Sequence, residues 1–127
     1  IGIVKKQDIS ENQAKYVFLS LGSNLGNRLI YLQKAIFWLN YFNIKIKKSS
    51  SIYETISWPN IKLPKYLNIV VKAQTNLNVI DLFKVSKLIE KKLGRKTSKK
   101  NNPRTCDIDI LDYDKKLFKK KVNKHKL

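Results

Sequence analysis

The spacing of apolar residues changes along this chain in a fixed order, and that order limits the possible folds more than any other feature. Apolar side chains recur every three or four positions over residues 28–40, as on one face of a helix, and again between Asn78 and Gly94. Around these stretches lie short runs that are apolar or that alternate with polar residues, as strands do. The sequence therefore predicts two helices and four strands, the strands over 16–21, 44–53, 66–74 and 105–113.

In chain order these elements run strand, helix, strand, strand, helix, strand. This order is two split βαβ units and predicts a ferredoxin-like α+β fold, with an antiparallel sheet and both helices on one face. The other face is then open to a ligand. Asn27 is expected to cap the first helix and Asn78 the second, and Gly94 is expected to end the second helix. Prolines 59 and 64 bracket a loop that cannot be regular.

Length and charge bound the class of protein. With 127 residues the chain suits one domain, expected over 16–127 after a leader or linker over 1–15. It carries 27 Lys and Arg against 9 Asp and Glu, a formal net charge of +18. No apolar run approaches the 18 or more residues of a membrane span. The single cysteine, Cys106, excludes an internal disulfide and indicates a reducing compartment, so a cytoplasmic location is expected.

The acids of this basic chain are concentrated in its last predicted strand. Four of the nine lie at 107, 109, 112 and 114. Asp107 and Asp109 are two residues apart, so on a strand they point the same way, roughly 6.5–7 Å apart along the chain. Two carboxylates at this spacing are suited to hard cations, and Arg104 beside them is suited to a phosphate. Basic segments flank the strand on both sides. The pattern suggests Mg²⁺-nucleotide chemistry, although Asp-x-Asp also occurs on edge strands with no metal role.

Four motifs occur in order along the chain: LGSNLGNR at 21–28, SSIYET at 50–55, PKYLN at 64–68 and PRTCDIDIL at 103–111. Together they closely resemble the 6-hydroxymethyl-7,8-dihydropterin pyrophosphokinase family of the folate pathway. The likeness runs from about residue 16 to the end of the chain. It implies transfer of a pyrophosphoryl group from ATP to the hydroxymethyl of a reduced pterin, with release of AMP. It also implies possible fusion or association with other folate-pathway enzymes.

The resemblance also implies roles for individual residues. Two Mg²⁺ ions would be held by Asp107 and Asp109. The catalytic set would be Asp107, Asp109, Arg104 and Arg95. The ATP contacts would be Glu90, Arg95, Lys96, Lys100, Arg104 and Ile110, with residue 95 in a loop that closes over ATP. The pterin contacts would be Thr55, Trp58, Tyr66 and Asn68, with the Tyr66 ring stacking on the pterin and the Asn68 amide pairing with its edge.

The chain departs from the family pattern at several places. Asn101 and Asn102 stand where Trp-Gly is usual, and lysines stand at 96 and 100 where arginines are common. The family's C-terminal segment, with a Pro-His motif and a second aromatic wall for the pterin, is expected to be missing. Two alternatives to an active enzyme stay open. One is a catalytically impaired remnant or fragment, and the other is a basic module that binds RNA through the open sheet face.

Overall fold

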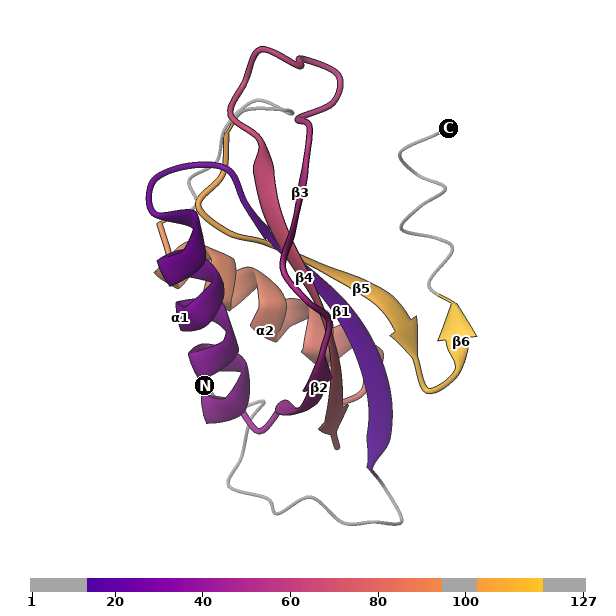
Figure 1. Ribbon diagram of the computed structural model, residues 1–127. Coiled ribbons are helices and arrows are strands. Elements are labelled where there is room, and N and C mark those ends of the chain that lie inside the picture. The colour runs from indigo at the N-terminus through magenta and orange to yellow at the C-terminus, as the bar shows by residue number, and fades with distance from the viewer. Residues whose placement is uncertain (1–13, 95–102, 118–127) are drawn as a thin grey trace.

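The computed structural model describes residues 14–94 and 103–117, in which two helices lie against one face of a single antiparallel sheet (Figure 1). The strand order is β2-β4-β1-β5-β6, and β3 also pairs with β4. This arrangement confirms the ferredoxin-like α+β fold. In chain order the elements are β1 (Lys15–Ser23), α1 (Arg28–Tyr41), β2 (Lys45–Ser49), β3 (Tyr53–Thr55), β4 (Tyr66–Thr75), α2 (Val79–Lys92), β5 (Asp107–Tyr113) and β6 (Lys116–Leu117).

Strand β1 lies at the centre of the sheet. The helices cover one face of this sheet and leave the other face open. It pairs with β4 from Lys15↔Thr75 to Ser23↔Leu67, and with β5 on its other side. Since successive side chains of a strand point to opposite faces, alternate residues of these strands enter the core beneath the helices. The fully buried apolar residues of the three strands are Val17, Leu19, Leu21, Val71, Ala73 and Ile108. The intervening residues of β1, β4 and β5 therefore lie on the face that the helices leave open (Figure 1).

Both helices begin as the sequence predicts, and α2 also ends as predicted, whereas α1 ends one residue later than predicted, at Tyr41. The Asn27 side chain accepts a hydrogen bond from the amide of Ile30 (3.2 Å) at the start of α1. At the start of α2, Asn78 accepts one from the amide of Asp81 (2.8 Å). Gly94 follows α2 with a φ of +96°, the left-handed conformation that glycine adopts without strain. Neither of the two described helices is long and apolar enough to cross a membrane.

The predicted strand over 44–53 is wrong as a single element, because it is interrupted after β2. At the break, the amide of Ser50 donates to the carbonyl of Val70 (2.8 Å), and the Ser50 hydroxyl accepts from the amide of Val70 (3.0 Å). The Ser50 hydroxyl thus replaces a backbone carbonyl as hydrogen-bond acceptor at this point of the sheet. Regular pairing with β4 resumes only at β3.

The last predicted strand is shorter than expected and is followed by a hairpin. β5 begins at Asp107 rather than at residue 105. Asp114 and Lys115 have φ values of 53° and 68°, and they turn the chain back into β6. The sequence predicted only a basic flank here. The predicted leader over 1–15 lies outside the described residues, apart from its last two positions, and β1 begins at Lys15.

Candidate active site

Three neighbouring strands, β4, β1 and β5, bring residues of the open face together in two adjacent rows. Gly22 of β1 lies opposite Asn68 of β4 on one side and opposite Asp107 of β5 on the other. In the next row Ser20 lies opposite Asp109. Because Gly22 has no side chain, the centre of the first row is open.

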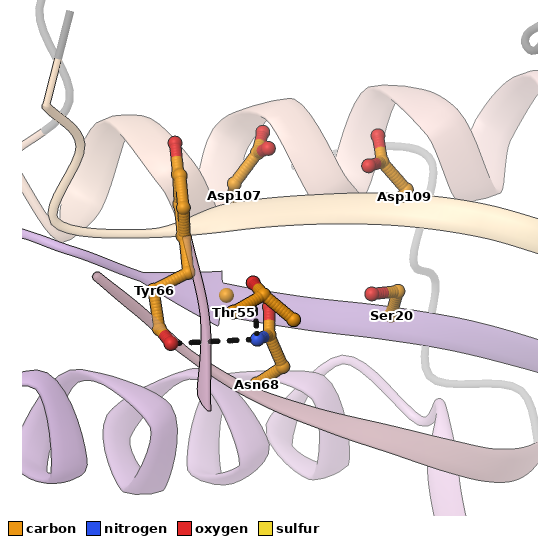
Figure 2. Close-up of a pocket in the computed structure, with 7 residues that line it drawn as sticks. Ser20, Thr55, Tyr66, Asn68, Asp107 and Asp109 are labelled. Atoms are coloured by element: carbon orange, nitrogen blue, oxygen red, sulfur yellow. Dashed lines mark hydrogen bonds between the residues drawn. The ribbon is translucent and has the colours of Figure 1, made fainter. Parts of the chain in front are cut away.

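A cavity of about 180 Å³ lies over these rows. Figure 2 shows its lining residues, with Asp107 and Asp109 along one strand and Thr55 beside Asn68. A Cβ atom at residue 22 would lie 3.2 Å from the side-chain oxygen of Asn68 and 3.3 Å from the ring of Tyr66. A side chain at residue 22 would therefore press on Asn68 and Tyr66, and glycine leaves this part of the cavity open. The complete lining is Ser20, Gly22, Thr55, Tyr66, Asn68, Asp107 and Asp109.

The amide of Asn68 is oriented by the strand beside it. Its Nδ2 donates to the hydroxyl of Thr55 (2.9 Å) and to the carbonyl of Tyr53 (3.3 Å). With the nitrogen held on that side, the Oδ1 atom faces the cavity above Gly22. The cavity thus offers a fixed hydrogen-bond acceptor next to the ring of Tyr66, which suits a flat heterocycle with polar edges.

The opposite wall of the cavity carries the two carboxylates that the sequence singled out. Asp107 and Asp109 both lie on the open face of β5, with Ser20 across from Asp109. All of these side chains offer oxygen atoms, which are the ligands that Mg²⁺ prefers. Among the described residues no group of three or more His, Cys, Asp and Glu side chains is arranged to hold a metal. Two carboxylates with the remaining positions left to water or phosphate oxygens are typical of Mg²⁺ sites, so the residues fit this ion.

Asn24, just beyond the end of β1, joins two segments that border the site. Its backbone N–H donates to the carbonyl of Arg104 (3.0 Å), and its side-chain Oδ1 accepts from the backbone N–H of Arg104 (2.7 Å). Its Nδ2 donates to the hydroxyl of Ser57 (3.0 Å) and to the carbonyl of Pro64 (3.2 Å). Asn24 itself is buried. One side chain therefore fixes both ends of the 57–64 loop and the backbone of the arginine that precedes the carboxylate strand.

Comparison with known proteins identifies the family to which this site belongs. Residues 18–127 match the model of the 7,8-dihydro-6-hydroxymethylpterin-pyrophosphokinase (HPPK) family. The chain belongs to this family. The match covers the whole cavity and both strands that carry its polar walls.

Individual relatives agree with the family model. The chain is 42% identical over 108 residues to the 2-amino-4-hydroxy-6-hydroxymethyldihydropteridine pyrophosphokinase of Aquifex aeolicus, a match covering 85% of this chain and 67% of that protein. It is 36% identical over 99 residues to the protein of the same name from Bacillus subtilis, covering 77% and 59%. It is 36% identical over 105 residues to the mitochondrial folate synthesis bifunctional protein of Pisum sativum, covering 83% of this chain and 20% of that protein.

Several predicted HPPK site residues are brought together by the fold, and others lie apart from the cavity. Thr55, Tyr66, Asn68, Asp107 and Asp109 all line it. The side chains of the remaining described candidates lie outside the lining: Trp58 is 78% exposed on the loop, Ile110 is 2% exposed in the core, and Glu90 and Arg104 border β5. Arg95, Lys96 and Lys100, together with Asn101 and Asn102, lie outside the described residues.

No role was predicted from the sequence for three residues of the site, although Gly22 and Asn24 lie in the motif at 21–28. Ser20 and Gly22 alternate with the buried Leu19 and Leu21, so the period of two in the first strand could have placed them on the open face. Asn24 gave no comparable signal, because its partners are 33, 40 and 80 residues away along the chain.

Proposed function

We propose that this chain transfers a pyrophosphoryl group from ATP to 6-hydroxymethyl-7,8-dihydropterin, giving the pterin diphosphate and AMP, in folate biosynthesis. The observation that supports this most strongly is the pairing of Gly22 with Asn68 on one side and with Asp107 on the other. A heterocycle site and a metal site are thereby neighbours in one cavity. The comparisons favour neither an RNA-binding module nor an impaired remnant.

The pterin is assigned to the wall formed by β3 and β4. Asn68 Oδ1 accepts a hydrogen bond from an N–H on the ring edge, while Tyr66 stacks against the ring. Thr55 holds the Asn68 amide in the orientation that this contact needs. Trp58, exposed on the adjoining loop, is assigned to cover the bound pterin.

The triphosphate is assigned to the wall formed by β5. Asp107 and Asp109 would hold two Mg²⁺ ions, which would neutralise phosphate charge and align the reacting groups. The pterin hydroxymethyl oxygen loses its proton to water and forms a bond to the β-phosphorus. The bond from that phosphorus to the bridging oxygen breaks, and this oxygen leaves with AMP. No covalent intermediate with the protein is needed.

The remaining nucleotide contacts are assigned by family resemblance. Arg104 binds phosphate through its guanidinium, and Asn24 fixes its backbone beside the cavity. Arg95, Lys96 and Lys100 bind the phosphates. Ile110, whose side chain is buried in the core, is assigned a contact with the nucleotide through its backbone on β5. For Glu90 the structure supports a different role, through its bond to the backbone of Ile108.

A cytoplasmic location and a partner from the folate pathway are also proposed. A cytoplasmic location rests on the single cysteine at position 106, which is buried. Fusion or association with another folate-pathway enzyme rests on the names of several relatives, which are called folate synthesis bifunctional proteins. The chain covers only 20% and 24% of those two relatives.

The test is AMP formation by the chain with Mg-ATP and the reduced pterin. Asp107→Asn and Asp109→Asn should each abolish it, because an amide is a poor ligand for Mg²⁺. Asp112→Asn is the matched control. It lies on the same strand, outside the cavity lining, and should retain the wild-type rate. Equal loss in all three variants, or no AMP from the wild-type chain together with no Mg²⁺-dependent ATP binding, would refute the proposal.

A further inference from the structure

On the edge of β5 that faces away from β1, a side chain binds the backbone at a position where a further strand could otherwise pair. On its inner side β5 pairs with β1, and on its outer side β6 reaches only Asp112 and Tyr113. At Ile108 the outer position is taken by Glu90 of α2, whose Oε2 accepts the backbone N–H of Ile108 at 2.7 Å. Ile108 lies between the two carboxylates of the proposed metal site.

This position is costly for a carboxylate. Glu90 is 2% exposed and lies in the last turn of α2, where the helix dipole disfavours negative charge. Its other oxygen is 3.3 Å from Nζ of Lys87, a side chain that is 42% exposed and so is well screened by water. The short charge-assisted bond to Ile108 offsets part of this cost.

We infer that Glu90 is a positioning residue, which fixes the backbone between Asp107 and Asp109 and so sets the direction of both carboxylates. The bond fixes the peptide unit that joins Asp107 to Ile108, and rotation of this unit would turn the two carboxylates relative to each other. Glu90 then acts on the metal site through β5, without contact with the nucleotide. The consequence for metal binding rests on the proposed function, whereas the bond itself does not.

Three variants separate the effect of the hydrogen-bond acceptor at residue 90 from the effect of its negative charge. Glu90→Gln keeps an oxygen that can accept the Ile108 amide and removes the charge. Glu90→Leu removes the acceptor at similar volume and suits the buried site. Lys87→Ala removes the ion pair and leaves the bond to Ile108 intact, so it is the matched control.

The variants are compared on the whole chain by three measurements. Hydrogen exchange of the Ile108 amide, followed by NMR without metal, reports the bond. Electron paramagnetic resonance of Mn²⁺ titrated into the chain with ATP present reports the metal site. Thermal unfolding reports stability. In the Leu variant we expect faster exchange at Ile108 and Mn²⁺ affinity lower by about tenfold or more, while thermal unfolding shows that the chain is still folded. The Gln and Ala variants should stay within about threefold of wild type, well below the loss typical for removal of a supporting residue.

Two results would overturn the inference alone. The first is Mn²⁺ affinity that is unchanged in the Leu variant although Ile108 exchanges faster. The second is loss of ATP binding in the Gln variant as large as in the Leu variant, which would show that the charge touches the nucleotide. If the wild-type chain binds no Mn²⁺ with ATP present, the proposed function fails, and the inference fails with it.

Discussion

Truncation of Asn24 to alanine should be among the most damaging single changes in this protein outside the apolar core. The side chain is buried and makes three hydrogen bonds at once: it accepts from the amide of Arg104 and donates to Ser57 and Pro64. Alanine removes all three. It leaves the amide of Arg104 and the carbonyl of Pro64 without this partner.

The expected magnitude follows from these contacts. A hydrogen bond within a protein contributes about 1 kcal/mol net, so three contribute about 3 kcal/mol, and buried groups left without partners add to the loss. We therefore expect the free energy of unfolding to fall by about 3–4 kcal/mol. For a domain of this size that corresponds to a melting temperature lower by roughly 10–15 °C. The loss is a large share of the 5–15 kcal/mol typical of whole domains.

The assay is urea unfolding followed by circular dichroism, with Asn40→Ala as the matched control. Asn40 undergoes the same truncation, but its side chain makes one exposed hydrogen bond, to the amide of Ile46 (3.0 Å), so about 1 kcal/mol should be lost. Equal losses of unfolding free energy in the two variants, at unchanged m-value, would contradict this expectation. That result would mean that the two loop segments hold their positions without Asn24.

The remaining predictions concern the cavity, alkaline pH and the surface. Gly22→Ala should weaken pterin binding roughly tenfold, because the new Cβ would press on the ring of Tyr66, and overpacking costs about 1–3 kcal/mol. Calorimetry should show ATP binding unchanged, and unchanged pterin affinity would place the pterin elsewhere. Burial, and then the adjacent carboxylate, raise the pKa of Tyr113 above its ordinary 10.0, so its contribution to stability is present at lower pH and is lost as the pH rises through the folded-state pKa. Unfolding measured from pH 9 upward should show this loss in the wild type and not in Tyr113→Phe. Arg28 and Glu54 form an exposed ion pair at 2.8 Å, which a double-mutant cycle should measure at below about 1 kcal/mol and falling with salt; a larger, salt-independent coupling would contradict this.

The elements of the fold could be predicted where the signal is local. The helices begin at Asn27 and Asn78, and both caps use a side chain and an amide three residues apart. The break after β2 could not be predicted, because it depends on bonds between Ser50 and Val70, which are twenty residues apart. The hairpin into β6 could not be predicted either, because it lies in a lysine-rich stretch whose composition says little about backbone conformation.

The candidate site likewise contains residues that could be predicted from local spacing and contacts that could not. Asp107 and Asp109 are recognisable from their spacing alone, because a strand places them on one side. Their position opposite Ser20 and Gly22 depends on strand register, which the sequence of either strand alone does not specify. The attachment of Glu90 to the edge of β5 is likewise a tertiary contact, across eighteen residues.

The alternation along β5 has a consequence for the accuracy of the site. Asp107 and Asp109 face the cavity only because Ile108 and Ile110 face the core, where both are buried. A slip of one residue between β1 and β5 would exchange the two pairs, sending carboxylates inward and isoleucines into water. Exposing the isoleucines would cost about 1.5–3 kcal/mol each, before any cost of burying charge. The hydrophobic core thus enforces the register between β1 and β5 that the polar site on the opposite face of the sheet requires.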